Sequence, residues 1–296
     1  MRILVSGASG FIGKPLTLLL RKNGHEVLRL VRSSTKAVDE IVWDPDRGIA
    51  IKEQFEGFDA VVHLAGETIS SLRWTKAKKK RILLSRTVGT KFLSQILSRT
   101  LEPPKVFISP SALGYYGDRG ETLIEDGAPA GSGFLSHVCS EWEKAAIAIE
   151  ARGSRVVHPR FGVVLGKGGG ALGNLLPIYR LGLGATLGDG QQWMSWIALE
   201  DAVAATYFAL MNDSIRGAFI AASPNPVRQE EFSRKLAAQL HRLACFRVPK
   251  WLLHLLFGQM ADELLLQSLK ASPTKLLRSG FQFQTADLDK ALSFAL

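Results

Sequence analysis

The sequence has few cysteines and no long apolar run free of charges. Its 296 residues include two cysteines, Cys139 and Cys245, which cannot form a disulfide framework, and this fits a reducing compartment. Two cysteines cannot complete a zinc site alone, and the six histidines show no H-x-x-x-H spacing, so we predict no metal site. No uncharged apolar run reaches the ~18 residues of a membrane span, and the first apolar run is too short for a signal peptide. We therefore expect a cytoplasmic protein with no membrane partner.

Acidic residues are absent from one long segment, and this absence accounts for most of the net charge. The chain has 37 Lys and Arg against 27 Asp and Glu, a net charge of +10. Nine basic residues and no acidic residue lie between Thr68 and Leu101. Because the remainder is close to neutral, we do not expect a nucleic acid as partner. We interpret the segment mainly as solvated helix faces, and binding of an anionic surface through Lys76–Arg81 is the weaker alternative.

Short apolar strands alternate with helical stretches along the first two thirds of the chain. We predict strands near residues 3–5, 27–31, 59–65, 106–108, 155–157 and 163–165, and helices near residues 11–23, 76–97, 135–151 and 201–211. The alternation predicts crossover units and a parallel sheet, and the continuous apolar strands indicate a sheet covered on both faces. The expected fold class is therefore α/β, with a doubly wound parallel sheet of the Rossmann type.

Glycine-rich loops at residues 166–170 and 182–190 follow the last of these predicted strands and indicate a domain boundary. We predict a dinucleotide-binding domain over residues 1–165 and a smaller C-terminal substrate-binding lobe over residues 166–296. Within that second part, residues 201–223 are expected to return to the sheet of the first domain.

Three glycines follow the first predicted strand at once and open a helix, in the run Gly7-Ala8-Ser9-Gly10-Phe11-Ile12-Gly13. Gly7 is expected to make the tight turn, Gly10 to let backbone approach a pyrophosphate, and Gly13 to let the helix pack on the strand. The helix N-terminus, at Phe11 and Ile12, would face the phosphates with unpaired N–H groups and a partial positive charge. This strand, turn and helix context predicts a dinucleotide site.

The end of the second predicted strand distinguishes between the two nicotinamide cofactors. NAD enzymes place an acidic residue there for the ribose 2′-hydroxyl. This chain has Arg32, followed by Ser33 and Ser34, and a guanidinium beside hydroxyls can bind a 2′-phosphate. NADP is therefore predicted as the cofactor, and NAD is disfavoured. The alternative is that Arg32 is a solvated loop residue.

The third predicted strand ends in Leu64-Ala65-Gly66-Glu67. Loops at the C-terminal edge of a parallel sheet line the ligand crevice. Gly66 would let the backbone pass close to the cofactor. Two roles stay open for Glu67, which could fix a ribose or cap the next segment.

Runs typical of one protein family extend along essentially the whole chain. They are GASGFIG at Gly7–Gly13, LAGE at Leu64–Glu67, RWT at Arg73–Thr75, SRT at Ser85–Thr87, SALGYYG at Ser111–Gly117, WEKAA at Trp142–Ala146, RFGVVLGKGGGAL at Arg160–Leu172, GDGQQWMSWI at Gly188–Ile197 and GFQF at Gly280–Phe283. The chain resembles the atypical extended short-chain dehydrogenase/reductases called epimerase family proteins, in the NAD-dependent epimerase/dehydratase superfamily. Its G-x-x-G-x-x-G spacing is similar to that of the extended group.

The resemblance implies an NADP-binding fold with a C-terminal substrate lobe. In the family's NADP-binding pattern, the glycine loop, Arg32, Leu64, Ala65, Arg86 and Val164 would contact the cofactor. Arg86 is also a reasonable phosphate partner on charge grounds.

The sequence lacks the Tyr-x-x-x-Lys pair that the resemblance leads one to expect. In catalytically active extended members, the Lys lowers the pKa of the Tyr, which exchanges a proton beside the hydride transfer, and a Ser or Thr assists. Ser111 stands at the hydroxyl position. Counting back from Glu143 places Leu135 at the Tyr position and Cys139 at the Lys position, and neither can replace them. No Tyr in the chain has a Lys four residues later.

Other groups could act in place of this pair. Tyr116 is the phenol we predict to act with Ser111, and the alternative is that Tyr116 forms an aromatic wall against the nicotinamide or the substrate. Cys139 could be a thiol nucleophile, although a buried, inert thiol is more usual. The family commonly has a His after its SWI run, where this chain has Ala198.

The C-terminal part offers one candidate substrate pocket and one helical pattern. Residues 191–196 combine amide, hydroxyl and aromatic groups, which is the composition of a small-molecule pocket, and the alternative is that Trp193 and Trp196 are core residues. We interpret residues 252–269 as a packed helix pair. The predicted function is an NADP-dependent oxidoreductase or epimerase of a small molecule, and the alternative is a non-catalytic NADP-binding sensor or regulatory protein.

Overall fold

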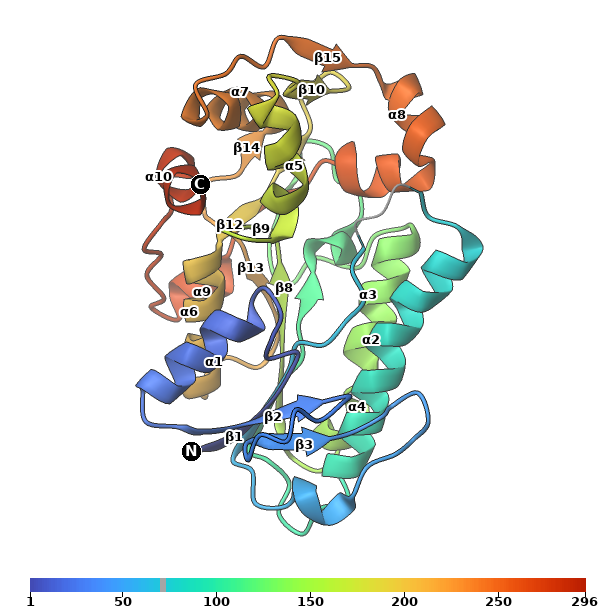
Figure 1. The fold of residues 1–296 in the computed structure, drawn as a ribbon, viewed down its shortest axis with the longest axis vertical. Helices are drawn as coiled ribbons and strands as arrows, with labels where there is room; N and C mark the ends of the chain where they lie inside the picture. Colours follow the sequence, from blue (N-terminus) through green and yellow to red (C-terminus); the bar gives the residue numbers. More distant parts are fainter. Residues whose placement is uncertain (70–72) are drawn as a thin grey trace.

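A parallel sheet forms the centre of the larger part of the molecule (Figure 1). The computed structural model describes residues 1–69 and 73–296. The strands of this sheet are β1 (Arg2–Ser6), β2 (Glu26–Val31), β3 (Glu40–Val42), β4 (Ala60–His63), β5 (Val106–Ile108), β6 (Ser111–Ala112), β8 (Arg155–Phe161) and β13 (Gly217–Ala221). They follow the order β13-β8-β5-β4-β1-β2-β3, with β6 beside β8, and their pairings are parallel.

Helices cover both faces of the sheet, because successive side chains of each strand point to opposite faces. Ile3 and Val5 of β1 belong to one apolar cluster, with α1, α6 and α9. Leu4 belongs to the cluster on the other face, with α2 and α4. The covering helices are α1 (Gly13–Lys22), α2 (Lys76–Leu97), α4 (Ile147–Glu150), α6 (Leu199–Met211) and α9 (Thr274–Arg278). In Figure 1, α1 and α6 lie on one side of the sheet and α2 on the other.

The order of the strands makes β1 a topological switch point, where doubly wound sheets have their ligand crevice. The chain runs from β1 outward through β2 and β3, then returns to β4 on the opposite side of β1. The loops that leave β1 and β4 therefore diverge, and ligands bind at such a switch point in doubly wound sheets.

The C-terminal segments form a smaller layer beyond this edge of the sheet, at the top of Figure 1. Its strands pair two by two: β9 with β12, β10 with β15, β11 with β14, and β7 with β16. Their bounds are β7 (Leu123–Ile124), β9 (Val163–Leu165), β10 (Ala185–Leu187), β11 (Trp193–Met194), β12 (Trp196–Ala198), β14 (Val227–Arg228), β15 (Phe246–Val248) and β16 (Lys270–Ala271). The remaining helices are α3 (Phe134–Lys144), α5 (Gly170–Arg180), α7 (Gln229–Gln239), α8 (Lys250–Phe257) and α10 (Leu288–Ala295), with short helical turns η1 (Lys52–Phe55), η2 (Leu113–Tyr116) and η3 (Ala261–Leu265).

The predicted fold class is confirmed, with local corrections. The predicted single helix over residues 135–151 is wrong, because α3 ends at Lys144 and α4 begins at Ile147. Residues 252–269 contain α8 and the short π-helical turn η3, separated at Gly258. Among the described helices, none has both the length and the apolar character needed to cross a membrane.

Candidate cofactor and substrate site

Each of the three glycines in the glycine loop is needed for a different steric reason. Gly7 has a φ of +68°, and a Cβ atom there would lie 2.8 Å from the backbone of Leu64 and Ala65. A Cβ at Gly13 would lie 2.0 Å from the Gly7 carbonyl oxygen, so helix α1 packs directly on the loop. Gly10 is exposed, and a Cβ there would meet only the Gly7 oxygen, at 3.0 Å. The loop is therefore closed toward the protein and open above Gly10.

The N-terminus of α1 carries no protein cap. No side chain accepts a hydrogen bond from its first turn, and that turn contains no acidic residue. Pro15 has no N–H group, and the N–H groups of Lys14 and Leu16 donate to the carbonyls of Gly10 and Ile12, so the N–H groups that can face a ligand are those before Lys14, where the helix dipole favours an anion. The open side of the loop and this helix end thus offer a site for a phosphate group.

Phe11 joins the glycine loop to the second glycine-rich loop. Cβ atoms at Gly169 and Gly170 would lie 2.7 and 2.6 Å from the Phe11 ring, and one at Gly166 would lie 3.2 Å from it. The Gly170 Cβ would also lie 2.7 Å from the carbonyl oxygen of Val164 in β9. These glycines therefore admit the Phe11 ring, and they bring β9 beside the phosphate-facing loop.

Arg32 lies just after β2 with an exposed side chain. Its one ion pair among the described residues is with Asp46, at 3.9 Å, and both side chains are about two-thirds exposed (64% and 66%). Such a pair contributes little, so the guanidinium can exchange partners. Arg29, three residues earlier in β2, is by contrast held by Asp39 at 2.7 Å. Of these two arginines, Arg32 is the one available to a ligand.

Two buried side chains, those of Ser6 in β1 and His63 in β4, fix the backbone just after β4. The Ser6 hydroxyl lies 2.6 Å from His63 Nδ1 and accepts a hydrogen bond from the Ala65 N–H at 3.3 Å. Leu64 donates its N–H to the Ser6 carbonyl at 3.1 Å. Burial lowers the pKa of His63 to about 4, so the ring is neutral at pH 7. Ser6 and His63 thus hold Leu64 and Ala65 in place, and no motif had marked either residue.

Glu67 is bound to helix α2. Its carboxylate lies 2.8 Å from Lys78 Nζ and 3.5 Å from Arg81 Nε, and its N–H donates to the Ser85 hydroxyl at 3.1 Å. The hydrogen bond from Lys78 lowers the pKa of Glu67. These contacts anchor the loop after β4. Glu67 does not cap helix α2, because the N-cap residue of that helix is Thr75. A ribose contact of Glu67 stays a prediction.

Arg86, on α2, lies over the end of β4. Its guanidinium carbon lies 3.7 Å from where a Cβ of Gly66 would be, and 5.1 Å from the centroid of the Trp142 ring. It donates hydrogen bonds to the Ile82 carbonyl at 3.2 Å and to the Ser85 hydroxyl at 3.5 Å. Burial lowers the pKa of Arg86.

Leu135 and Cys139 lie on the buried side of helix α3. Both side chains are buried, and Leu135 packs where a Cβ of Gly114 would lie 3.1 Å away. Burial raises the pKa of the Cys139 thiol, an effect that the Ser111 hydroxyl opposes. Ser111 is 3% exposed, and its hydroxyl makes no hydrogen bond among the described residues. The catalytic role of Ser111 stays a prediction.

Tyr116 does not have the environment of an acid–base group. Its side chain is fully buried, and its hydroxyl donates to the Asp126 carbonyl at 3.2 Å and accepts from Arg160 at 2.9 Å. Burial raises its pKa to about 12, against the opposing effect of Arg160. The predicted proton exchange by Tyr116 is therefore not supported, and Tyr116 does not form a wall at an open surface either. Its role in this geometry is to pack in the core with Tyr115.

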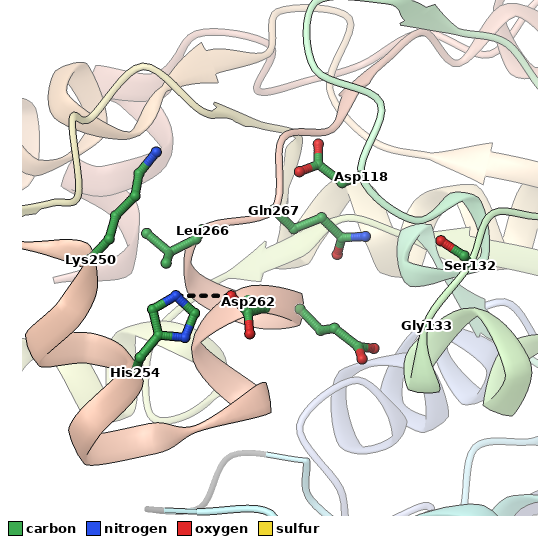
Figure 2. A pocket seen from close by; sticks show the side chains of 9 residues that line it. Asp118, Ser132, Gly133, Lys250, His254, Asp262, Leu266 and Gln267 are labelled. Atoms are coloured by element: carbon green, nitrogen blue, oxygen red, sulfur yellow. Dashed lines mark ion pairs between the residues drawn. The ribbon is translucent and has the colours of Figure 1, made fainter.

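A polar cleft lies between the start of α3 and helix α8 (Figure 2). It has a volume of about 380 Å³ and is lined by Asp118, Ser132, Gly133, Lys250, His254, Asp262, Glu263, Leu266 and Gln267. His254 Nε2 lies 3.2 Å from Asp262 Oδ1. Glu263 accepts the N–H groups of Phe134 and Leu135 at 2.9 and 2.6 Å, so the cleft borders the helix that carries Leu135 and Cys139. No sequence motif pointed to this cleft.

The side chains of residues 191–196, which we predict as a substrate pocket from the sequence, mainly contact other parts of the protein. Trp196 is fully buried and donates to the Asn225 carbonyl, as the core alternative requires. Gln192 donates to the carbonyls of Leu187 and Leu265. Trp193 stacks under Arg228, whose guanidinium carbon lies 3.9 Å from the ring centroid. Within the described residues, no group of three His, Cys, Asp or Glu side chains is arranged to hold a metal ion.

Comparison with known proteins extends over the full chain. The family model described as "NAD dependent epimerase/dehydratase family" matches residues 3–220, and a domain of unknown function matches residues 248–295. The epimerase family protein of Mycobacterium leprae is 36% identical over 99% of this chain and 95% of its own length. That of Bacillus subtilis is 37% identical, over 99% and 97%.

Two solved structures with similar sequences share the fold. Human epimerase family protein SDR39U1, crystallised with NADPH, has a TM-score of 0.89 at 32% identity, covering 100% of this chain and 99% of its own. A nucleoside-diphosphate sugar epimerase of Corynebacterium glutamicum has a TM-score of 0.83 at 32% identity, covering 100% of this chain and 58% of its own. These matches confirm the resemblance that the motifs indicated, and the chain belongs to the NAD dependent epimerase/dehydratase family, among its epimerase family proteins.

Proposed function

We propose that this protein binds NADP in the crevice above β1 and uses it in a redox or epimerase reaction on a small molecule. The observation that carries the proposal is the pairing of an open phosphate site, at Gly10 and the uncapped N-terminus of α1, with an exposed Arg32 just after β2. A phosphate site and an exposed guanidinium, each just after one of two adjacent strands, suit a pyrophosphate and a 2′-phosphate. The human relative crystallised with NADPH supports the same choice.

The residues around the crevice fit the parts of this cofactor. Gly7, Gly10, Phe11, Ile12 and Gly13 would hold the pyrophosphate, and Arg32 the 2′-phosphate. Contacts from the far side of the crevice would come from Leu64, Ala65, Gly66, Arg86 and Val164. When bound, NADP accepts a hydride and NADPH donates one. The protein's contribution is to orient the cofactor.

The substrate is proposed to bind in the cleft of Figure 2. This cleft is lined by Ser132 and Gly133, just before the first turn of α3, and by Glu263, which accepts the N–H groups of Phe134 and Leu135 in that turn. Its side chains are carboxylates, a lysine, a histidine and an amide, which would orient a polar small molecule by hydrogen bonds.

A turnover screen tests the proposed reaction. We expect NADPH consumption with some member of a set of sugars, aldehydes and ketones. Tyr116→Phe should leave turnover unchanged, since the Tyr116 hydroxyl is held by Arg160 and Asp126. Ser111→Ala should lower turnover, because Ser111 offers the unpaired hydroxyl. Turnover lost in Tyr116→Phe, with an unchanged melting temperature, would contradict the assignment. Turnover lost only in Cys139→Ser would indicate a thiol mechanism.

Arg32→Ala should weaken the binding of NADPH and not that of NADH. Loss of one charge-assisted hydrogen-bonding contact costs on the order of 1.5–3 kcal/mol, so the dissociation constant for NADPH should rise about 10- to 150-fold. NADH has no 2′-phosphate for Arg32 to bind. Isothermal titration of wild type and variant measures both affinities, with Arg47→Ala, another exposed arginine, as control. An equal loss for both cofactors would contradict a 2′-phosphate role.

A second function is favoured by one observation. Helix α3 presents an apolar Leu135 and a buried, neutral Cys139 where the family pattern has its acid–base pair. A protein that binds NADP and signals its presence needs no such pair. Tight NADPH binding without turnover of any substrate would favour this sensor or regulatory function over the enzymatic one.

A further inference from the structure

The outer end of the C-terminal lobe exposes large apolar side chains. Single exposed apolar residues are normal, but a group of them on neighbouring segments marks an interaction site. The segments are the loop after α5, strand β15 with the residues before it, and helix α8, and they lie at the top of Figure 1, at one end of the long axis of the molecule. Six side chains on them are 53–76% exposed, and we call these six residues the apolar tip: Leu181, Leu183, Leu243, Phe246, Trp251 and Leu255.

Backbone contacts hold the first two of these segments side by side. Strand β10, which follows the loop after α5, pairs with β15, and Ala185 is the partner of Phe246. The loops that enter these two parallel strands are also joined, because Arg242 donates a hydrogen bond to the Arg180 carbonyl at 3.1 Å. Leu181, Leu183 and Leu243 therefore lie at the same end of the paired strands.

Helix α8 continues the chain directly after β15. Its Leu253 is 2% exposed, so the helix rests on the protein through this side chain. Trp251 and Leu255 are one turn apart, hence on one face of the helix, and both are about two-thirds exposed (66% and 64%). The helix thus presents two large apolar side chains to solvent beside the strands.

The segments that carry the apolar tip have charge of one sign. Residues 170–188 and 232–261 contain no Asp or Glu. Arg180 and Arg242 are both exposed, and neither takes part in an ion pair within residues 1–69 and 73–296. The apolar side chains are therefore accompanied by cations that have no anionic partner in the described chain.

Two further cations of these segments pair only weakly. Arg247 lies 3.5 Å from Glu230, and Lys250 lies 2.8 Å from Asp189, both partners coming from just outside the two segments. All four side chains are 48–59% exposed, and such solvated pairs contribute little. Another anion can therefore take the place of either carboxylate.

This combination of apolar and basic groups distinguishes between possible occupants. A two-fold contact with a second copy would bring the same arginines together, and like charges repel. The surface of an anionic membrane instead accepts apolar side chains below its headgroups, tryptophan at the level of the headgroups, and basic side chains at its phosphates. An end of the long axis can also reach a flat surface without obstruction by the rest of the molecule.

We propose that the apolar tip binds the surface of a membrane that contains anionic lipids, with Trp251 and Leu255 inserted among the headgroups and Arg180 and Arg242 against the lipid phosphates. Binding of this kind is peripheral and needs no spanning helix. The expectation of no membrane partner rested on the lack of a spanning segment, so the proposal replaces it for this surface. It does not depend on the binding of NADP.

Co-sedimentation of the full chain with lipid vesicles tests the proposal. At about 0.1 M salt the protein should bind phosphatidylcholine vesicles that contain about one third phosphatidylserine, and should bind pure phosphatidylcholine at least about tenfold more weakly. The double variant Trp251→Ser, Leu255→Ser should bind the mixed vesicles at least about tenfold more weakly than wild type, because two apolar side chains no longer enter the lipid. Arg242→Glu should also lose about tenfold, and most of this loss should disappear at about 0.5 M salt.

Matched control variants separate the apolar tip from other surfaces. Leu18→Ser with Leu101→Ser removes two apolar side chains that are 61% and 86% exposed but lie elsewhere, and should bind the mixed vesicles as wild type does. Lys80→Glu reverses an exposed charge on helix α2 and should also change nothing. Unchanged melting temperatures show that the variants are folded, and Arg242→Glu carries the test should the double variant at the tip not fold.

Three results would overturn the proposal. One is a wild type that binds neither kind of vesicle. Another is a loss of binding in Lys80→Glu with none in Arg242→Glu, which would assign the anionic surface to Lys76–Arg81. The third is self-association of the wild type that disappears in Trp251→Ser, Leu255→Ser without any binding of vesicles, which would make a second copy the occupant of the apolar tip.

Discussion

Gly10→Val should abolish NADPH binding while the chain still folds. A valine side chain would project into the open space above the loop, where the pyrophosphate is proposed to lie, and would keep phosphate oxygens from the N–H groups of α1. We expect the affinity to fall by more than about 100-fold, since the side chain excludes all contacts of the pyrophosphate. A thermal shift assay measures this directly, because a ligand that binds only the folded state raises the melting temperature.

Two glycine substitutions serve as controls for Gly10→Val. Gly173→Val adds the same side chain at an exposed helical position where a Cβ meets nothing within 4 Å, and should leave the NADPH-induced shift intact. Gly13→Val should instead destabilise the fold, because its Cβ would lie 2.0 Å from the Gly7 oxygen. The contact of a Gly10 Cβ with that same oxygen, at 3.0 Å, predicts only a modest loss of stability. A normal shift in Gly10→Val would refute the phosphate site.

Glu143→Ala should lower the free energy of unfolding by about 3–5 kcal/mol, because it leaves Arg160 buried without its carboxylate. Arg160 donates two hydrogen bonds to Glu143, both 2.8 Å long, and the side chains are 6% and 14% exposed. The same guanidinium lies 3.4 Å from the centroid of the Tyr115 ring. The pair therefore joins α3 to β8 and to the aromatic turn beside the crevice.

Urea unfolding of matched variants measures this effect. Glu141→Ala removes a carboxylate from the same helix, but its ion pair with Lys144 is exposed, so we expect a change below about 1 kcal/mol. Equal effects of the two substitutions would show that burial of the Arg160 pair does not stabilise the fold. In Glu143→Ala we also expect Tyr116→Phe to cost less than in wild type, since both side chains bind Arg160.

The parts of the fold that follow from local sequence could be predicted. The strand, glycine turn and helix at residues 2–22 are as predicted, and the contacts that require Gly10 and Gly13 are with Gly7 and its neighbour, whereas Gly7 itself is also confined by the distant backbone of Leu64 and Ala65. The predicted helix over residues 76–97 has the same bounds in the structure, starting after the Thr75 cap. The parallel sheet follows from the alternation of such elements, because parallel strands need crossover connections.

Contacts between distant segments could not be predicted in this way. Glu263 caps the first turn of α3, more than 120 residues earlier, and nothing in its own neighbourhood indicates this partner. The Phe11 ring is likewise received by glycines about 155 residues later. Tyr116 follows the same rule: its position after a sheet strand suggested a reactive phenol, whereas burial and Arg160 determine its chemistry. Burial is set by the whole fold, so local patterns do not reveal it.

Isothermal titration of the wild-type protein with NADPH and with NADH tests the central claim most directly. The exposed Arg32 guanidinium and the open loop at Gly10 predict saturable binding of NADPH, at least about tenfold tighter than that of NADH, and none to Gly10→Val. Equal affinities for the two cofactors, or NADPH binding that survives in Gly10→Val, would contradict the account.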